Sequence, residues 1–278
     1  FSEIIAAHGI QPIIGCQLPI NLNSISENQS TKLPNASMVF IAKNEVGYSN
    51  LINLSSELYL YEYNKLNGLD LDKITDRSEG LICMSGGLEG PINKLFEDTK
   101  EALARDLTER LKKIFDDRFY LELNRHPSQE TRREMDSDIE NLVLENADYF
   151  NIPLVATNDV YFLDKSLYEP HDALLCIAEG NYVDQKKDRR SLSEDHFFKS
   201  SEQMKELFKD IPEAITNTVE IAMRCSFRPE PRDPILPKFS TDANNDLMSQ
   251  SNEGLEIRFQ NMKNVFDKDE YYNRLKYE

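Results

Sequence analysis

Short apolar runs alternate with amphipathic stretches from residue 1 to about residue 164. The apolar runs have the length of strands and are bounded by polar residues, glycine or proline. The stretches between them carry leucine, isoleucine or alanine three or four positions apart, which is typical of helices with one apolar face. This alternation predicts repeated βα units and a parallel sheet. The expected strands cover residues 12–20, 37–44, 80–87, 119–126 and 153–162, and the expected helices cover residues 46–65, 100–116 and 130–150.

The pattern becomes mainly helical after residue 164. Pro212 stands at an expected first helical turn, where the missing N–H group of proline costs nothing. Residues 228–238 contain four prolines, which predicts an extended connector between domains. A last helix is expected at about residues 252–278. We therefore expect a barrel domain in residues 1–200 and a helical connector in residues 201–278.

Length and charge limit the function classes. The 278 residues can bury the core of one large domain, or of one domain with an appendage. The 32 Lys and Arg residues against 49 Asp and Glu residues give a formal charge of -17, which repels phosphate backbones. The basic run at residues 186–190 is short and polar, and we interpret it as a solvated turn. The chain itself is therefore not expected to bind nucleic acid.

Cysteine usage and hydropathy indicate the compartment. The four cysteines form no C-x-x-C pair and lie mostly in apolar runs, as reduced core thiols do. No apolar stretch approaches the roughly 20 residues that a membrane span needs. These features predict a protein of the reducing cytoplasm without membrane attachment.

Two of the expected strands end in residues that are able to bind metal. His126 ends one run, and Asp159 lies near the end of another. In a parallel α/β barrel the carboxyl ends of the strands meet at one face, so the two side chains could share a site. Tyr161 stands where such a site would want an imidazole or carboxylate, and a phenol is a poor ligand. We interpret this as a metal site that has lost members; alternatively, His126 and Asp159 only form hydrogen bonds at the strand ends.

Three further features have simple interpretations. Gly86 and Gly87 either let a phosphate approach the backbone or form a turn with positive φ. His171 lies beside an apolar stripe and is expected to cap a helix or to form a buried hydrogen bond. His8 and His196 lie in polar surroundings and are expected at the surface.

Eight segments resemble those of one known family, in the same order. They are GIQPIIGCQ, VGYSNLINL, EGLICMSGGLEGPI, FYLELNRH, LVATNDVYF, HDALLCIAEG, FFKSSEQMKELF and IPEAITNTVEIAMRC. The family is the PHP (polymerase and histidinol phosphatase) domain of the bacterial replicative DNA polymerase III alpha subunit. The resemblance implies an α/β fold, an incomplete TIM-like (β/α)7 barrel without the first PHP strands, followed by a helical, Pro-containing connector toward the palm domain. The final EYYNRLKYE resembles the helix that leads into the palm, so we expect a fragment that ends before the palm.

The resemblance also sorts the residues of the candidate site. Intact members hold a trinuclear metal cluster at the strand ends, and such clusters hydrolyse phosphate esters. His126 and Asp159 match two of its ligands, whereas Gln17 replaces a glutamate, Gly87 a cysteine and Tyr161 a histidine. The resemblance therefore implies a degenerate metal site and no catalytic residue in this chain.

These implications lead to a functional expectation. The parent protein would be a DNA-directed DNA polymerase, a nucleotidyltransferase of bacterial DNA replication that uses Mg and meets DNA through other domains. The PHP domain would be a structural module that docks the proofreading exonuclease subunit within the polymerase III holoenzyme, beside its other subunits. The fragment alone would have no enzymatic activity and no cofactor. The alternative is an active phosphoesterase, a nuclease or a pyrophosphatase, which binds Zn or Mn at the PHP site.

Overall fold

The computed structural model describes residues 1–25, 33–60, 68–128, 133–185, 192–234, 236, 238–262 and 267–278. They form two compact units, Phe1–Pro229 and Glu230–Glu278. The basic run at residues 186–190, interpreted as a solvated turn, lies outside the described residues. In the described ranges no helix is long and apolar enough to cross a membrane.

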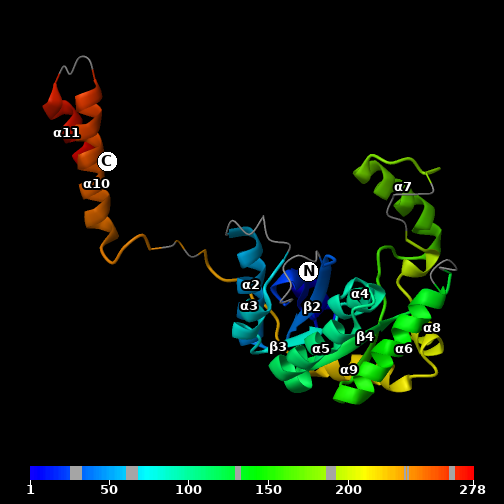
Figure 1. The fold of residues 1–278 in the computed structure, drawn as a ribbon. Coiled ribbons are helices and arrows are strands. Elements are labelled where there is room, and N and C mark those ends of the chain that lie inside the picture. Colours follow the sequence, from blue (N-terminus) through cyan, green and yellow to red (C-terminus); the bar gives the residue numbers. More distant parts are fainter. Residues whose placement is uncertain are drawn as a thin grey trace. The chain divides into compact units, whose positions relative to one another are not determined.

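All five expected strands are present in one sheet, each shorter than predicted (Figure 1). They are β1 Gly15–Ile20, β2 Ala36–Ala42, β3 Leu81–Met84, β4 Phe119–Asn124 and β5 Leu154–Thr157. Their order across the sheet is their order in the sequence. The architecture is therefore mixed α/β, as expected, while closure into a seven-stranded barrel stays a prediction.

The prediction of a wholly parallel sheet is wrong, because β2 runs against both of its neighbours. β1 and β3 each pair with β2 in antiparallel orientation, whereas β3, β4 and β5 are parallel to one another. Between β2 and β3 the chain first returns to the start of β2, where Leu69 bridges to Ile20. It then crosses the sheet again, and Leu81 pairs with Ala42 at the far end of β2. The carboxyl ends of β1, β3, β4 and β5 still lie at one edge, because these strands share a direction.

The helices agree with the periodicity where it was strongest. The described α-helices of the first unit are α1 Ser2–Ala7, α2 Glu45–Leu60, α3 Leu71–Asp76, α4 Pro91–Glu97, α5 Glu101–Phe115, α6 Arg133–Phe150, α7 Tyr168–Glu179, α8 Ser201–Leu207 and α9 Pro212–Arg224. Helices α2, α5 and α6 correspond to the three expected in the first part of the chain, and residues 61–65 and 130–132 of those predictions lie outside the described ranges. Pro212 begins α9, as predicted.

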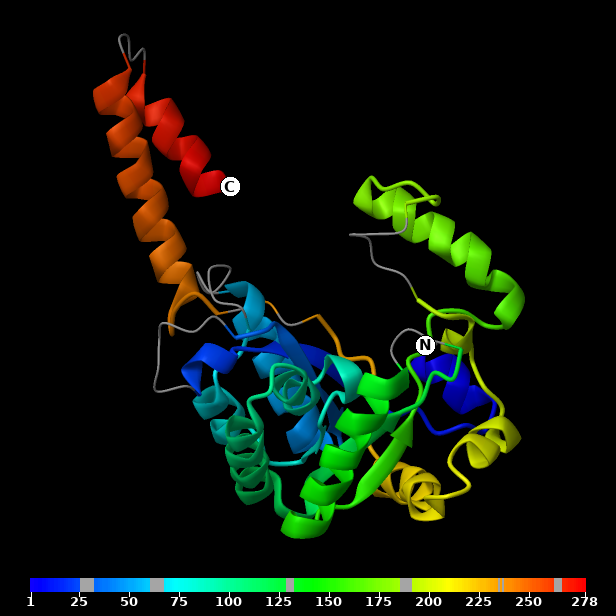
Figure 2. The same ribbon diagram turned by 45° about the vertical axis from the view of Figure 1, so that its right-hand side comes forward.

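The two faces of the sheet are covered differently, because successive side chains of a strand point to opposite faces. On one face Leu81, Phe119 and Leu121 belong to the large core that α2, α4, α5 and α6 complete. On the other face Ile82, Tyr120 and Val155 pack against α9, which lies along β5 (Figure 2). Alternation places a set of polar side chains on this second face, nearer the strand ends: Gln17, Ser37, Glu122, Asn124 and Thr157.

Packing groups α8 and α9 with the sheet in the first unit. The expected boundary at residue 200 separates the barrel domain from the connector as the family resemblance implies them, and this boundary stays a prediction. The prediction of a single helix at residues 252–278 is wrong. The second unit contains two helices, α10 Ala243–Asn261 and α11 Lys268–Tyr277. Helix α10 ends where the backbone of Met262 is extended. Asp267 starts the new helix, because its side chain accepts a hydrogen bond from the N–H group of Asp269.

Candidate functional site

The turn after β3 has a backbone conformation that favours glycine. Gly86 has a φ of 88° and Gly87 a φ of 55°, both in the left-handed region. A Cβ atom on Gly86 would overlap the carbonyl oxygen of Ser37, and one on Gly87 would overlap Oδ1 of Asn124. Of the two interpretations of this glycine pair, the turn with positive φ is therefore confirmed.

Two side chains from β4 occupy the inner side of this turn. Glu122 accepts a hydrogen bond from the N–H group of Gly86. Asn124 accepts one from the N–H group of Leu88 at 3.2 Å, and its Nδ2 donates to Oγ1 of Thr157 at 2.8 Å. The anion that the Gly86 amide binds is therefore a carboxylate of the same chain, which argues against the phosphate interpretation.

Glu122 is a buried carboxyl that the sequence analysis missed. It is 5% exposed. Burial raises the pKa of Glu122 to about 7 and the charge of Asp159 adds to the rise, while hydrogen bonds from Gly86, Gly87 and Thr157 oppose it. The available signal was one acidic residue inside the otherwise apolar run FYLEL, because a carboxyl in the middle of a buried strand needs a structural or functional partner.

His126 follows β4 and lies flat against His196. Their ring centroids are 4.1 Å apart with 3° between the ring planes, and His126 is 8% exposed. Among the residues that the structure describes, neither ring nitrogen of His126 has a hydrogen-bond partner. Burial lowers the pKa of His126 to about 4, and the neighbouring His196 and Lys199 act in the same direction. The lowered pKa favours the neutral imidazole of His126 near pH 7. Within the described ranges, His126 does not form the strand-end hydrogen bond of the alternative interpretation.

The expectation that His196 lies at the surface is wrong. His196 is buried in the 3-10 turn Glu194–His196, where its ring nitrogen Nδ1 accepts a hydrogen bond from the N–H group of Ser193 at 3.1 Å. Its carbonyl oxygen accepts from the N–H group of Tyr161 at 2.9 Å. The segment is polar in sequence, yet it folds back over the ends of β4 and β5. Residues that are far from this segment in the sequence therefore bury it, and its local polarity led to the wrong prediction of an exposed histidine.

Asp159 and Tyr161 follow β5 and approach the same histidine. The charge of Asp159 acts to raise the pKa of His196, against the lowering that burial causes. The ring of Tyr161 lies 5.8 Å from that of His196 and 5.8 Å from that of His171, which is half-buried. His126 and Asp159 thus have His196 as a common neighbour. The two strand ends meet, as the sequence suggested, while His8 is exposed.

Arg125 fixes the end of β4 beside His126. Its Nη2 lies 2.5 Å from Oε1 of Glu140 on α6, and its Nη1 lies 2.6 Å from Oδ1 of Asp210. The guanidinium carbon also lies 4.8 Å from the ring centroid of Phe208. Charge-assisted, forked bonds of this kind hold a side chain in one geometry. The strand end is therefore positioned by its neighbours on α6 and in the α8–α9 region.

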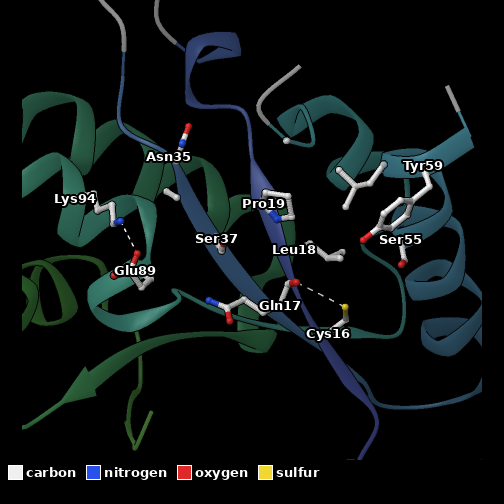
Figure 3. A pocket seen from close by; sticks show the side chains of 13 residues that line it. Cys16, Gln17, Leu18, Pro19, Asn35, Ser37, Ser55, Tyr59, Glu89 and Lys94 are labelled. Carbon is white, nitrogen blue, oxygen red and sulfur yellow. Dashed lines mark hydrogen bonds and ion pairs between the residues drawn. The ribbon is translucent and has the colours of Figure 1, made fainter. Parts of the chain in front are cut away.

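Gln17 and Tyr161 face one open pocket, together with Ser37 and Glu89. A neighbouring pocket shares Gln17, Ser37 and Glu89 (Figure 3). Figure 3 also shows Lys94 beside Glu89, with 2.5 Å between Nζ and Oε2. The polar groups of the pocket that Tyr161 lines are thus an amide, two hydroxyl groups and one carboxylate that is paired with an ammonium group.

Comparison with known proteins identifies the family. Residues 1–126 match the PHP domain. A DNA polymerase III subunit alpha of Caulobacter vibrioides is 40% identical over 278 residues, which cover 97% of this chain and 23% of that protein. Residues 1–126 thus belong to the PHP domain family. DNA polymerase III alpha subunits from Rickettsia bellii and Escherichia coli are 36% and 33% identical to this chain, over 97% and 90% of its length and 23% and 21% of theirs. It spans less than a quarter of each of these relatives.

The metal cluster implied by the PHP resemblance does not fit the residues at these strand ends. Zinc and related ions need three or four thiolate, imidazole or carboxylate ligands. Within the described ranges, no group of three or more His, Cys, Asp and Glu residues is arranged to hold a metal. At Gly87 even the space for a ligand is taken, since a Cβ atom there would overlap Asn124. Gln17 and Tyr161 offer only an amide and a phenol to the pocket.

Proposed function

We propose that this PHP domain is a structural module of a DNA polymerase III alpha subunit and does not hydrolyse phosphate esters. The observation that carries the proposal is the position of Asn124, which fills the space that a ligand side chain at Gly87 would need. A lost ligand that left a hole could be replaced by water or by a neighbouring side chain. Here the space belongs to a hydrogen-bonded amide, so the strand ends are built to be stable without a metal.

The activity of the whole protein follows from its relatives. They are named DNA polymerase III subunit alpha, and we extend that role to the protein that contains this chain. It would then be a DNA-directed DNA polymerase of chromosomal replication, with Mg bound in its palm domain. The PHP region of that protein would form the seven-stranded barrel. The charge of -17 supports contact with DNA through other domains, because a chain so acidic repels phosphates.

Within such a holoenzyme, this PHP domain would dock the proofreading exonuclease subunit. Helix α7 supports this role, because Leu174 is 60% and Ile177 is 78% exposed on it. Adjacent exposed apolar side chains on one helix are typical of surfaces that a partner covers. The variant Leu174→Glu/Ile177→Glu is expected to bind the purified exonuclease subunit at least about tenfold more weakly in calorimetry.

The matched control is Val219→Glu, which alters an exposed apolar residue of α9. It is expected to bind as the unaltered chain does. Equal affinities of all three chains would show that α7 is not the docking surface. An unaltered chain that does not bind the subunit at all would contradict the docking role itself.

One observation favours an active phosphoesterase as the second candidate. In the part of the chain that the structure describes, both ring nitrogens of the buried His126 lack a hydrogen-bond partner, so either nitrogen is available as a metal ligand. A phosphodiesterase assay with added Mn separates the two candidates. The structural proposal predicts the same background rate for the unaltered chain and for His126→Ala. Turnover that His126→Ala abolishes would establish the phosphoesterase instead.

A further inference from the structure

Glu122 occupies a position where its charge state matters to the backbone. Its carboxylate accepts from the Gly86 N–H group and interacts with the Gly87 amide and the Thr157 hydroxyl group. Its own N–H group donates to Oγ of Ser85 at 2.9 Å. Through its carboxylate and its backbone N–H group, Glu122 thus contacts three consecutive residues of the turn after β3 and ties them to β4 and to the end of β5.

The backbone N–H groups of this turn are held by side chains of β4, and the turn is packed tightly against β2. Gly86 and Gly87 both have left-handed backbone conformations, and the N–H groups of both residues interact with the Glu122 carboxylate. The next N–H group, that of Leu88, is held by Asn124 at 3.2 Å. The backbone oxygen of Ser37 packs directly against Gly86 from the other side. The Glu122 carboxylate is therefore the acceptor that holds this turn from the β4 side.

We propose that Glu122 is a proton-controlled latch on the turn formed by residues 85–89. When Glu122 is ionised, the carboxylate holds the Gly86 and Gly87 amides through charge-assisted hydrogen bonds, and the turn is closed. When Glu122 is protonated, its oxygens are weaker acceptors and its new O–H group needs an acceptor of its own, so the turn loosens. The turn carries Glu89, which lines both pockets with Gln17 and Ser37. The latch therefore controls one wall of these pockets. The inference goes beyond the proposed function, which makes no use of this charge.

The groups that face Glu122 place the transition in an accessible range of pH. Asp159 faces it from the segment after β5, and Cys83 interacts with it from β3. Burial and the charge of Asp159 raise the pKa of Glu122 to about 7, against the opposing hydrogen bonds from the turn and Thr157. The closed form is thus expected above about pH 7 and the loosened form below it.

The sequence offers a direct spectroscopic test. Ser85–Gly86 is the only Ser-Gly pair of the chain and Gly86–Gly87 the only Gly-Gly pair. Cell-free synthesis with 15N-glycine and with carbonyl-13C serine or glycine therefore identifies both amide signals in the intact 278-residue chain. In the unaltered chain both amide protons are expected to shift together, with a midpoint near pH 7. Signals that stay constant between about pH 5.5 and 8.5 would overturn the latch.

Two variants assign the titration to Glu122. Glu122→Gln is expected to abolish the common midpoint, whereas Glu89→Gln, which removes an exposed carboxylate of the same turn, is expected to retain it. A midpoint that survives in Glu122→Gln would overturn the proposal. If Glu122→Gln does not fold, Asp159→Asn tests whether Glu122 is the group that titrates. This variant leaves Glu122 in place and removes the negative charge of Asp159, which faces Glu122. A lower midpoint in Asp159→Asn supports the latch, and an unchanged midpoint shows that another group titrates.

Discussion

The imidazole rings of His126 and His196 lie parallel, with centroids 4.1 Å apart. The contact joins the end of β4 to the segment that folds back over it. Asp195, the neighbour of His196, strengthens this junction by accepting hydrogen bonds from the N–H and Oγ–H groups of Ser128, both at 2.6 Å. The end of the strand is thus closed by ring stacking and hydrogen bonds between side chains and backbone.

The buried stack predicts loss of stability in acid. The pKa of His126 is lowered from 6.5 to about 4, so the unfolded chain binds a proton more readily than the folded chain. The contribution of this group is present above pH 6.5 and is lost as pH falls toward about 4. Between pH 7.5 and 5 the loss should be roughly 2 kcal/mol. His126→Phe keeps a ring for stacking but does not titrate, so it should lose less stability over this interval.

Urea unfolding of both chains in a chelating buffer checks this prediction. The quantity compared is the change in unfolding free energy between the two pH values, and not the stability of either chain at one pH. An identical change in both chains would show that His126 is not the group that takes up the proton.

Glu122 predicts a pH dependence of the opposite sign. Its pKa is raised from 4.5 to about 7, so the folded chain binds the proton more tightly than the unfolded chain. This contribution is present below pH 4.5 and is lost as pH rises through about 7. Glu122→Gln should therefore gain roughly 2 kcal/mol relative to the unaltered chain between pH 5 and 8. The measurement is again urea unfolding, and a constant difference between the two chains would contradict the prediction.

Gly87 should not tolerate a side chain. Gly87→Ala combines a positive φ with overlap between the new Cβ atom and Oδ1 of Asn124, and it should cost on the order of 3 kcal/mol. Gly180→Ala is the matched control, because Gly180 also has a positive φ but nothing within 4 Å of a Cβ atom. The control should cost about 1 kcal/mol. Equal costs in thermal unfolding would show that Asn124 does not restrict the site.

Arg125 should contribute more to stability than an exposed ion pair does. Arg125→Met leaves Glu140 and Asp210 without their common partner and should cost roughly 2 kcal/mol. Lys209→Met removes the exposed pair of Lys209 with Glu206 and should cost much less, because solvent screens such a pair. Urea midpoints of the two variants provide the comparison. A smaller effect for Arg125→Met than for Lys209→Met would show that the β4 end is held by other contacts.

Apolar periodicity predicted the strands and the longer helices, because a buried face imposes a repeat on the sequence. The expected helix at residues 100–116 is found as α5 Glu101–Phe115. The reversed orientation of β2 was not predictable in this way, since a buried strand has the same pattern in either direction. The orientation of β2 relative to β3 depends on how often the chain crosses the sheet between these two strands, and the apolar pattern does not record this.

The candidate site was predictable only in part, for a similar reason. His126 and Asp159 were found because strand direction brings the ends of β4 and β5 together. His196 and Glu122 were misjudged or missed, since their surroundings come from segments far away in the sequence. The burial of His196 depends on contact with His126, which lies 70 positions earlier in the chain, and no local pattern records that contact.

The central claim is that this PHP domain is built without a metal centre, and its most direct test is the metal content of the chain. The chain is dialysed against excess Zn or Mn, then against metal-free buffer, and the bound metal is measured by plasma mass spectrometry. The account predicts well under one metal ion per chain, with no difference between the unaltered chain and His126→Ala. One or more ions retained per chain, and lost in His126→Ala, would contradict it.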